Sequence, residues 1–501
     1  MKKIILLCIA LLVGAIVSGC TDSAPSGPTP GLGGVTVTKY VAVGNSLTAG
    51  YQSNGLYESA QIYSYPNMIA QQLVKAGAPL GTFEQPYWPD PGIPDPNPGT
   101  NFGKAQRYVI ISFANPKAPV IGPKGEAVTA PAPKNAATVL RPYDNLGIPG
   151  IPLAGFMDTT GTYQAPPLGR DAILRWTSNA ALGKSVYRQI ATLKALGQTP
   201  DLVTFWLGAN DVLGFATSGG VFPATGNAPT PSATFGFLYK QALDALRGAL
   251  PSAKTKIIVA TIPNVTSVPF FTTVNPQVAQ SLAALGLSLY YQKHTEDSIG
   301  TGKSKLTEPY APLITLKGSA YAALLGDTLG KYYASIGATP HSGINTKFPF
   351  GLHPLNPFPN SLILDSLEQD MSATAIAAYN STIKSVAALD TADVFDAFTF
   401  FNGVKANGYS VAGETYTADY ISGGLFSLDG VHPSSRGYAI VANQYILILN
   451  SKYGASIPYV DVSTIPGIPM PLGKYAAGSK IIPTISVQAW KSFDALWGSG
   501  F

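Results

Sequence analysis

The sequence predicts an α/β fold built on a parallel sheet that helices cover on both faces. Short apolar and β-branched runs have the character of buried strands, and each is followed by a loop and then a helical pattern. Strands that alternate with helices form such a sheet. We expect these strands at residues 40–43, 202–207, 256–262 and 394–395. The length of 501 residues provides for a large core, and the 12% of charged residues predicts an unusually apolar exterior.

Residues 1–19 have the pattern of an export signal. Lys2 and Lys3 precede an apolar run that ends at Val17, which is shorter than the roughly 20 residues that a membrane-spanning helix requires. The following Val-Ser-Gly-Cys20 resembles the lipobox of bacterial lipoproteins, whose cysteine is lipidated and becomes the first residue. The alternative is an ordinary signal peptide that ends near a cysteine. Residues 20–34, rich in Ser, Pro, Gly and Thr, are then a flexible tether.

Cysteine and charge content exclude several classes of site and partner. Cys8 is lost with the signal, so Cys20 is the only cysteine left, which excludes disulfides within the monomer and cysteine metal or redox sites. Loss of Lys2 and Lys3 lowers the net charge from +5 to +3. The sequence has no long basic run, so we expect no nucleic-acid partner, and nothing calls for a metal or cofactor.

Three distant segments contain residues suited to nucleophilic catalysis. They are Gly44-Asn45-Ser46-Leu47, Gly208-Ala209-Asn210-Asp211 and Asp429-Gly430-Val431-His432-Pro433. Ser46 follows the first expected strand and Asn210 follows the second, so both should lie at the carboxyl edge of the sheet, where ligands bind in such folds. His432 comes from the loop before an expected helix at residues 435–449, whose apolar stripe contains Tyr438, Val441, Ala442, Tyr445 and Ile446.

These segments, in this order, identify the chain as resembling the SGNH hydrolase superfamily, also called GDSL esterases and lipases. The resemblance implies a flavodoxin-like three-layer α/β/α sandwich, here with large insertions. It also implies a glycine amide for the oxyanion, and the segment most similar to that block is Asn145-Leu146-Gly147-Ile148-Pro149-Gly150, with Gly150 as the candidate and Gly147 as the alternative. Asn45 stands where the family usually has Asp.

The residue types predict an acyl-transfer mechanism. Serine needs a base to take its proton, and histidine is the side chain whose ordinary pKa lies near neutrality. Asp429 lies three residues before His432, close enough to orient its ring in a triad with Ser46. By resemblance to the family, the oxyanion would be met by the backbone amides of Ser46 and Gly150 and by the side-chain amide of Asn210.

Each motif also has an interpretation without catalysis. Asn-Asp at 210–211 and Asp-Gly at 429–430 are common turn sequences. His353-Pro354 repeats the His-Pro pair but lacks the preceding aspartate, and Gly408-Tyr409-Ser410-Val411-Ala412 lacks the last glycine of a nucleophile elbow, so we expect a loop there. The agreement of all the blocks in order favours the catalytic interpretation.

We expect one hydrolase domain at residues 35–451 with insertions at about 51–140 and 264–372, followed by a C-terminal extension, residues 452–501, packed on it. The first insertion contains an expected strand at 108–113. The second contains a helix from Asn275 with Val278, Leu282, Leu285 and Leu289 on one face, either a lid over an acyl pocket or a packing element. The segment at residues 318–337 could equally be part of a lid or a packing element.

Three hypotheses follow for function. The first is a lipid-anchored carboxylester hydrolase that acts on small-molecule or lipid acyl esters. The second keeps the chemistry but takes O-acetyl groups on a polysaccharide or another glycan. The third is a non-catalytic envelope lipoprotein that binds a ligand. Thr21 after the cysteine is compatible with sorting to the outer membrane of a Gram-negative bacterium, and the sequence does not determine which face it occupies or the oligomeric state.

Overall fold

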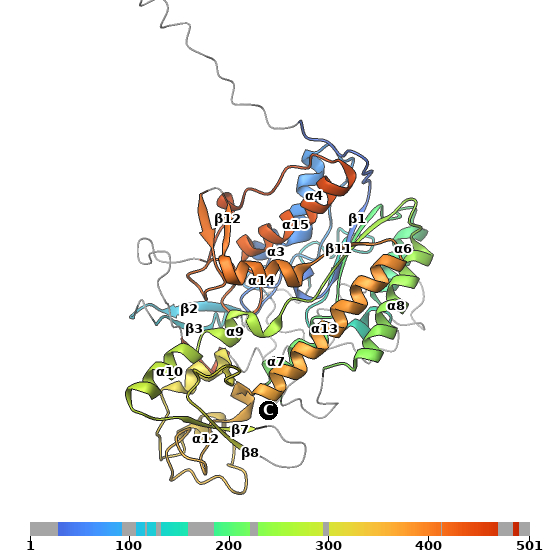
Figure 1. The fold of residues 1–501 in the computed structure, drawn as a ribbon. Helices are drawn as coiled ribbons and strands as arrows, with labels where there is room; N and C mark the ends of the chain where they lie inside the picture. Colours follow the sequence, from blue (N-terminus) through green and yellow to red (C-terminus); the bar gives the residue numbers. More distant parts are fainter. Residues whose placement is uncertain are drawn as a thin grey trace, which may run out of the picture.

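The fold is centred on a parallel sheet, and the computed structural model describes residues 29–92, 107–115, 118–126, 132–158, 185–220, 229–293, 300–411, 413–468 and 484–489. Cys20 and the expected signal peptide lie outside these ranges. The sheet has five strands in the order β11-β6-β5-β1-β4 (Figure 1). Their bounds are Tyr40–Gly44 for β1, Asn145–Gly147 for β4, Leu202–Trp206 for β5, Lys256–Ala260 for β6 and Asp393–Phe395 for β11. All pairings are parallel.

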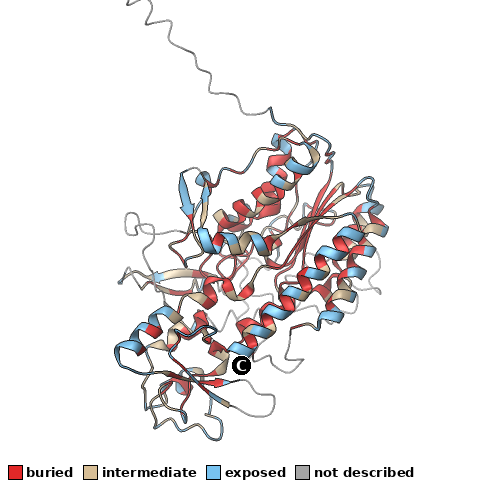
Figure 2. Ribbon diagram, viewed as in Figure 1, coloured by how far each residue is buried: buried red, intermediate tan, exposed pale blue. Residues whose placement is uncertain are grey.

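This strand order confirms the flavodoxin-like α/β/α sandwich, because the second strand along the chain lies outside the first and the later strands extend on its other side. Helices α4 (Tyr65–Lys75) and α15 (Ser435–Tyr453) pack together on one face of the sheet. Helices α6 (Val186–Ala195), α8 (Ser232–Ala249) and α13 (Ser366–Leu389) cover the other (Figure 1). Figure 2 shows that the buried residues lie on the strands and on the helix sides that face them.

The predicted strands of the sheet are confirmed, with β6 ending two residues before the expected Ile262. The fifth strand, β4, was not predicted, because three residues give no readable pattern. It is defined by its pairing with β1, in which Asn145 lies beside Ala42 and Gly147 beside Gly44. The predicted helix at 435–449 is also confirmed, and it extends to Tyr453.

The first insertion contains helix α3 (Glu58–Gln61) and strands β2 (Tyr108–Ser112) and β3 (Val120–Pro123). The predicted strand at 108–113 is therefore confirmed. A segment near the C-terminus, β14 (Thr484–Ile485), adds to this small sheet beside β3. The extension thus contacts the body, as do residues 455–468, where Asn443 of α15 exchanges hydrogen bonds with the backbone of Val460.

The second insertion is a set of short elements that lies at the lower left of Figure 1. Its helices are α9 (Pro269–Thr272), α10 (Asn275–Ala284), α11 (Ser319–Ala322) and α12 (Lys331–Ile336), with 3₁₀ turns η3 (Val265–Ser267), η4 (Leu316–Gly318) and η5 (Asn360–Leu362). Its strands form two antiparallel pairs, β7 (Leu289–Lys293) with β8 (Gly300–Ser304), and β9 (Leu313–Ile314) with β10 (Ile363–Leu364).

The predicted apolar stripe of the helix from Asn275 is only half right. Val278 and Leu282 are buried, but α10 ends at Ala284 because Gly286 has φ +65°, the left-handed conformation that stops a helix. Leu285 is consequently exposed, and Leu289 belongs to strand β7.

Further elements lie between β11 and α15 and after α15. They are α14 (Ala397–Asn407), the hairpin of β12 (Tyr409–Val411) and β13 (Glu414–Tyr416), and, after α15, the turn η6 (Val462–Thr464). The loop expected around Ser410 is therefore partly a strand. The last residues of the expected tether contact the body of the protein. Gly31 forms a β-bridge with Ser456, and Gly34 donates its N–H to Tyr453 O.

Candidate active site

Ser46 is the first residue of a short helix, α2 (Ser46–Ala49), that begins directly after β1. Asn45 caps this helix through Oδ1, which accepts a hydrogen bond from Leu47 N–H at 3.0 Å. A carboxylate oxygen would accept the same bond, so asparagine can replace the family's usual aspartate here. Gly44 must be glycine, since a Cβ there would come within 2.0 Å of Thr48 Oγ1. The local packing thus fixes where the serine leaves the strand.

His432 and Asp429 meet Ser46 as the sequence predicts. His432 Nε2 lies 2.8 Å from Ser46 Oγ, and its Nδ1 lies 3.0 Å from Asp429 Oδ2. All three side chains are buried. Ser434 caps α15 by accepting a hydrogen bond from Gly437 N–H at 3.2 Å, so the loop that carries His432 is attached to a rigid helix.

Asp429 is held as a carboxylate by the groups around it. Its Oδ1 accepts hydrogen bonds from the N–H groups of Val431 and His432 at 2.9 and 2.8 Å, and its Oδ2 accepts one from Asn54 N–H at 3.0 Å. Burial alone would raise the pKa of Asp429, but the charge of His432 and these hydrogen bonds outweigh it and leave the pKa lowered. The carboxylate can therefore stabilise an imidazolium on His432.

Sequence reasoning missed the turn at residues 51–54, which supports the triad. Ser53 and Asn54 both have positive φ, at 49° and 58°, a conformation that non-glycine residues seldom adopt. This conformation lets Asn54 N–H reach Asp429 and lets Ser53 N–H reach Ser427 Oγ at 2.9 Å. The ring of Tyr51 lies 4.8 Å from that of His432. Asn54-Gly55 is a common turn dipeptide, and Gln52 and Gly55 exchange backbone hydrogen bonds around it, so the turn itself had a sequence signal, whereas its contacts with Asp429 and Ser427 had none.

Besides Ser46, the predicted oxyanion donors Gly150 and Asn210 lie on two segments that contact each other. Gly147 N–H already donates to Asn145 Oδ1 at 3.0 Å, whereas Gly150, with φ +73°, donates no hydrogen bond from its N–H within the described residues. Asn210 Nδ2 donates one bond to Ile151 O at 2.9 Å, and its other N–H has no partner within the same residues. The geometry thus favours Gly150 over Gly147 as the available amide.

Asp211, the residue after Asn210, also holds the loop that carries Gly150. Its Oδ2 accepts a hydrogen bond from Leu153 N–H at 2.8 Å, and its Oδ1 accepts one from Thr230 Oγ1 at 2.9 Å. Burial raises the pKa of this carboxyl to about 6. The sequence motif contains Asp211, but its contact with the glycine loop could not be read from it.

An apolar cavity of about 120 Å³ opens beside Ser46. Asn45, Ser46, Asn210 and His432 are its polar side chains, and within the described residues no charged side chain lines it. Its aliphatic and aromatic walls come from the strand ends of the sheet, η3 and the residue after it, α7 (Asn210–Thr217), α14, α15 and the loop before α15. They include Trp206, Leu213, Val265, Val268, Phe395, Ala397, Phe400, Phe401, Phe426, Val431 and Val441. Such a lining suits a hydrocarbon chain.

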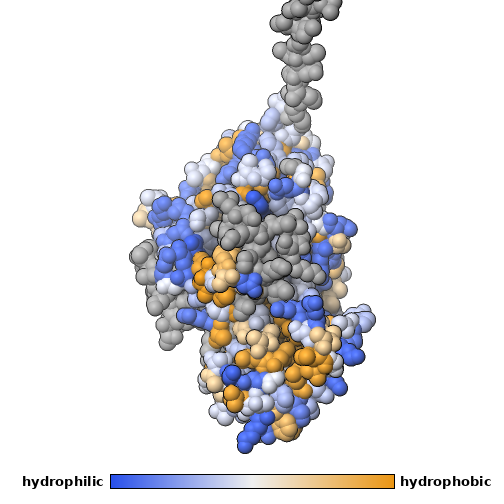
Figure 3. All heavy atoms as spheres, turned by 90° about the vertical axis from the view of Figure 1, so that its left-hand side faces the viewer, coloured by the Kyte–Doolittle hydropathy of each residue, from blue (hydrophilic) through white to orange (hydrophobic). Residues whose placement is uncertain are grey.

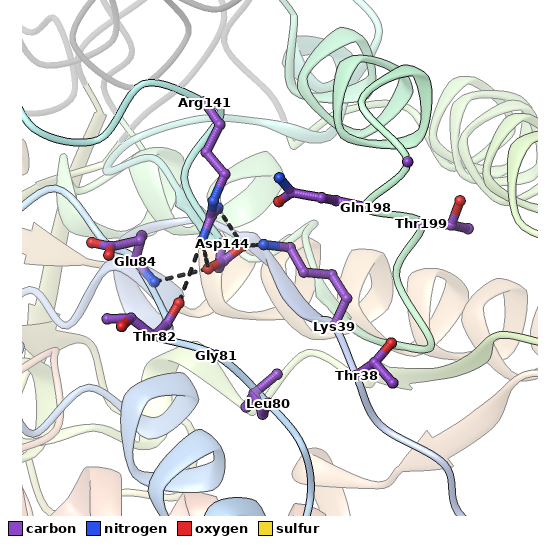
Figure 4. Close-up of a pocket in the computed structure, with 11 residues that line it drawn as sticks. Thr38, Lys39, Leu80, Gly81, Thr82, Glu84, Arg141, Asp144, Gln198 and Thr199 are labelled. Carbon is purple, nitrogen blue, oxygen red and sulfur yellow. Dashed lines mark hydrogen bonds and ion pairs between the residues drawn. The ribbon is translucent and has the colours of Figure 1, made fainter.

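A second cavity of about 490 Å³ lies at the opposite, amino edge of the sheet (Figure 4). Asp144 is the centre of its charged groups. It accepts two hydrogen bonds from Arg141 at 2.8 Å, lies 2.5 Å from Lys39 Nζ, and accepts a bond from Glu84 N–H at 2.8 Å. Burial lowers the pKa of Lys39 in spite of this partner. Lys39 and Arg141 both form ion pairs with the one buried carboxylate of Asp144, so this cluster has the form of a structural ion network.

The other candidate features do not approach the triad. His353 Nδ1 accepts a hydrogen bond from Leu355 N–H at 3.2 Å and its ring stacks on Phe348, while His294 lies outside the described residues. No cluster of three or more His, Cys, Asp or Glu side chains suited to a metal occurs in the part of the chain that the structure describes. Within that part, too, no helix combines the length and the apolarity that crossing a bilayer requires.

Comparison with known proteins found several solved structures to which the chain is similar. Among solved structures, the chain is similar to a lipase/acylhydrolase from Enterococcus faecalis, with 12% identity, 84% of this chain and 99% of that chain covered and a TM-score of 0.29. It is also similar to a protein described as a GDSL-like lipase from Parabacteroides merdae, with 12% identity, coverage of 84% and 99% and a TM-score of 0.32, and to a Lactobacillus plantarum protein, with 10% identity, coverage of 83% and 98% and a TM-score of 0.29.

A comparison with curated proteins found no match. The sequence profile of the GDSL-like Lipase/Acylhydrolase family matches residues 40–315. This range contains Ser46, Gly150 and Asn210, while Asp429 and His432 lie beyond it and reach the site through the fold. Because the match covers more than half of the chain, this protein belongs to the GDSL-like lipase/acylhydrolase family of ester hydrolases.

Proposed function

We propose that this protein is a serine carboxylester hydrolase that cleaves acyl esters through a Ser46–His432–Asp429 triad and an acyl-enzyme. The observation that carries the proposal is the continuous hydrogen-bonded path from Ser46 Oγ to His432 and on to Asp429, with distances of 2.8 and 3.0 Å. Such a path activates a serine hydroxyl, because the base lies in reach of its proton and the carboxylate fixes the base's orientation.

In the first half-reaction, Ser46 Oγ bonds to the ester carbonyl carbon while its proton moves to His432 Nε2. The oxyanion that forms is met by the amides of Ser46 and Gly150 and by Asn210 Nδ2. Collapse of the intermediate breaks the bond to the alcohol oxygen, which leaves with the proton from His432. In the second half-reaction, water attacks the carbonyl carbon of the acyl-serine while His432 takes its proton. His432 then returns this proton to Ser46 Oγ, and the carboxylic acid departs.

The apolar cavity beside Ser46 supports an aliphatic acyl group as the substrate part that the site binds. Phe395, Phe400 and Phe401 are among its walls, and a site lined this way gains little from the hydroxyls of a glycan. A chain of several methylenes would gain about 0.8 kcal/mol for each one buried. This favours acyl esters of longer chains over O-acetyl groups.

The test is hydrolysis of p-nitrophenyl esters from acetate to palmitate by the chain from residue 21 onward, which keeps every described residue. We expect Ser46→Ala to lower kcat by about 10⁴-fold or more, and Ser410→Ala, at an exposed serine of β12, to leave it within about twofold. Activity confined to acetate would favour the O-acetyl esterase. No turnover, with no labelling of Ser46 by an organophosphonate, would favour the non-catalytic binding lipoprotein.

We also propose that the protein is anchored by lipid on Cys20 in the outer membrane of a Gram-negative bacterium. The basis is the lipobox-like Val17-Ser18-Gly19-Cys20 and the Thr21 that follows. We expect metabolic labelling with an alkyne fatty acid to mark the wild-type chain and not Cys20→Ser. The variant should move from the outer-membrane fraction to the soluble periplasmic fraction, and labelling of both chains alike would contradict the anchor.

A further inference from the structure

The segment that forms one wall of the acyl cavity continues into an exposed apolar turn. No residue from 257 to 292 carries a charged side chain. This stretch contributes Val265 and Val268 to the cavity, then forms α9 and α10, and ends at β7. Its last part before β7, residues 283–287 with the sequence Ala-Ala-Leu-Gly-Leu, is exposed at every position. We call these five residues the apolar turn.

Two exposed leucines lie on either side of Gly286 in the apolar turn. The exposed fraction is 69% for Leu285 and 39% for Leu287. Gly286, with φ +65°, ends α10, and the N–H groups of Gly286 and Leu287 donate to the carbonyls of Ala283 and Leu282, so the turn caps the helix while its two leucine side chains stay exposed. Figure 3 views the molecule from the side on which α10 lies in Figure 1, and hydrophobic residues gather on the lower part of that face.

Cationic side chains lie next to the apolar turn. Leu289, two residues after the turn, pairs with Ser304 of β8, which places the exposed Lys303 and Lys305 at the same end of the hairpin. No carboxylate among the described residues forms an ion pair with either lysine. The nearby Glu308 instead accepts hydrogen bonds from Lys305 N–H and Ser304 Oγ. Lys303 Nζ lies 5.3 Å from the ring of Tyr290.

The loop that follows β8 adds an amphipathic aromatic residue. Tyr310 is 77% exposed, and two residues later Pro312 O accepts a hydrogen bond from Asn275 Nδ2 at the start of α10. The loop therefore joins the lysine end of the hairpin to the first turn of α10, whose other end carries the apolar turn. Leucines that enter the hydrocarbon, lysines at anionic headgroups and tyrosine at the boundary between them form the pattern of an interfacial membrane site.

We propose that the apolar turn, with Lys303, Lys305 and Tyr310, docks the protein on an anionic lipid bilayer. The docking is proposed as a property of the folded body alone, since the described chain begins at the end of the molecule away from α10 (Figure 1). The role of the docking, delivery of lipid esters to the cavity, rests on the proposed esterase function. The binding itself does not, so it is measured without turnover.

The test is sedimentation of the chain from residue 21 onward, which has no lipid, with phosphatidylcholine vesicles that contain no or 30% phosphatidylglycerol. We expect binding to the anionic vesicles. Leu285→Asp with Leu287→Asp should weaken it at least tenfold, and Lys303→Gln with Lys305→Gln should weaken it about fivefold for each lysine. The matched controls are Leu140→Asp with Leu389→Asp and Lys75→Gln with Lys254→Gln, exposed residues of the same types elsewhere, which should bind as wild type does.

Circular dichroism and urea unfolding check that each variant is folded, and none of these residues lines the cavity. If wild type fails to bind anionic vesicles, or if the turn variant binds as tightly as its control, the docking proposal is wrong even when ester hydrolysis is intact. A dimer in sedimentation velocity that only the turn variant disrupts would also overturn it, because the face would then bind a second copy.

Discussion

Asp211 connects the two segments that would form the oxyanion hole. Asn210 binds Ile151 O through its side chain while Asp211 binds Leu153 N–H through its own, so adjacent residues hold the glycine loop from both sides of Pro152. The carboxylate is almost wholly buried and has no cationic partner in the described residues. Its ionised form is therefore costly, and its neutral form could make the same contacts by donating to Thr230 Oγ1.

This arrangement predicts a pH-dependent effect of Asp211→Asn. The pKa of Asp211 is raised from 3.8 to about 6, so ionisation opposes folding as the pH rises from about 4 to about 6 and the loss then stays constant. At about 1.4 kcal/mol per unit, asparagine should raise the free energy of unfolding by about 3 kcal/mol at pH 7.5 and by far less at pH 4.5. Urea unfolding of both proteins at the two pH values measures this.

Kinetics separate this effect from the role of Asp211 in positioning. Asparagine can still accept from Leu153 N–H and donate to Thr230 Oγ1, so kcat of Asp211→Asn should stay within a few fold of wild type. Asp211→Ala frees the loop and should lower kcat about 10²-fold, comparable to the loss of one oxyanion donor. A stability difference independent of pH, or equal kcat for both variants, would contradict this account.

At the scale of elements, the sequence predicted those parts of the fold that are set by local composition. Strands β1, β5 and β6 are continuous apolar runs because both of their faces are buried, and α15 shows a helical stripe. Strand β4 could not be predicted, since Asn145-Leu146-Gly147 becomes a strand only through its pairing with β1. The end of α10 depended on the conformation of one glycine, Gly286.

The same distinction applies to the candidate site. Ser46, Asn210, Asp429 and His432 could be chosen because their residue types carry the chemistry and their positions follow strands or precede a helix. The groups that support them act largely through backbone atoms: Asn54 through its N–H and Leu153 through its N–H. Backbone donors are the same in every residue but proline, so side-chain patterns do not reveal them. The turn at residues 53–54 is signalled by Asn54-Gly55, but its hydrogen bonds to Asp429 and Ser427 could be seen only in the folded protein.

For the whole molecule, the two edges of the sheet have different physical roles. The carboxyl edge holds the triad and the apolar cavity, and the amino edge holds Asp144 with Lys39 and Arg141 (Figure 4). Lys39 precedes β1 and Asp144 precedes β4, so their ion pair joins the starts of two neighbouring strands whose ends carry Ser46 and lead to Gly150. The ion pair between Lys39 and Asp144 therefore helps to hold the register of β1 against β4, and with it the positions of the residues at the active-site edge.

This predicts that Asp144→Asn harms stability without harming catalysis. The substitution leaves the nearly buried Lys39 without a carboxylate, and removal of one partner from a buried pair costs about 3–5 kcal/mol. We expect the free energy of unfolding in urea to fall by about this amount, while kcat on p-nitrophenyl butyrate at 25 °C stays within about twofold, since the triad lies at the other edge. Lys240→Gln, which breaks the exposed pair with Asp244, should cost under about 1 kcal/mol. A large loss of kcat with unchanged stability would mean that Asp144 acts on the active site directly.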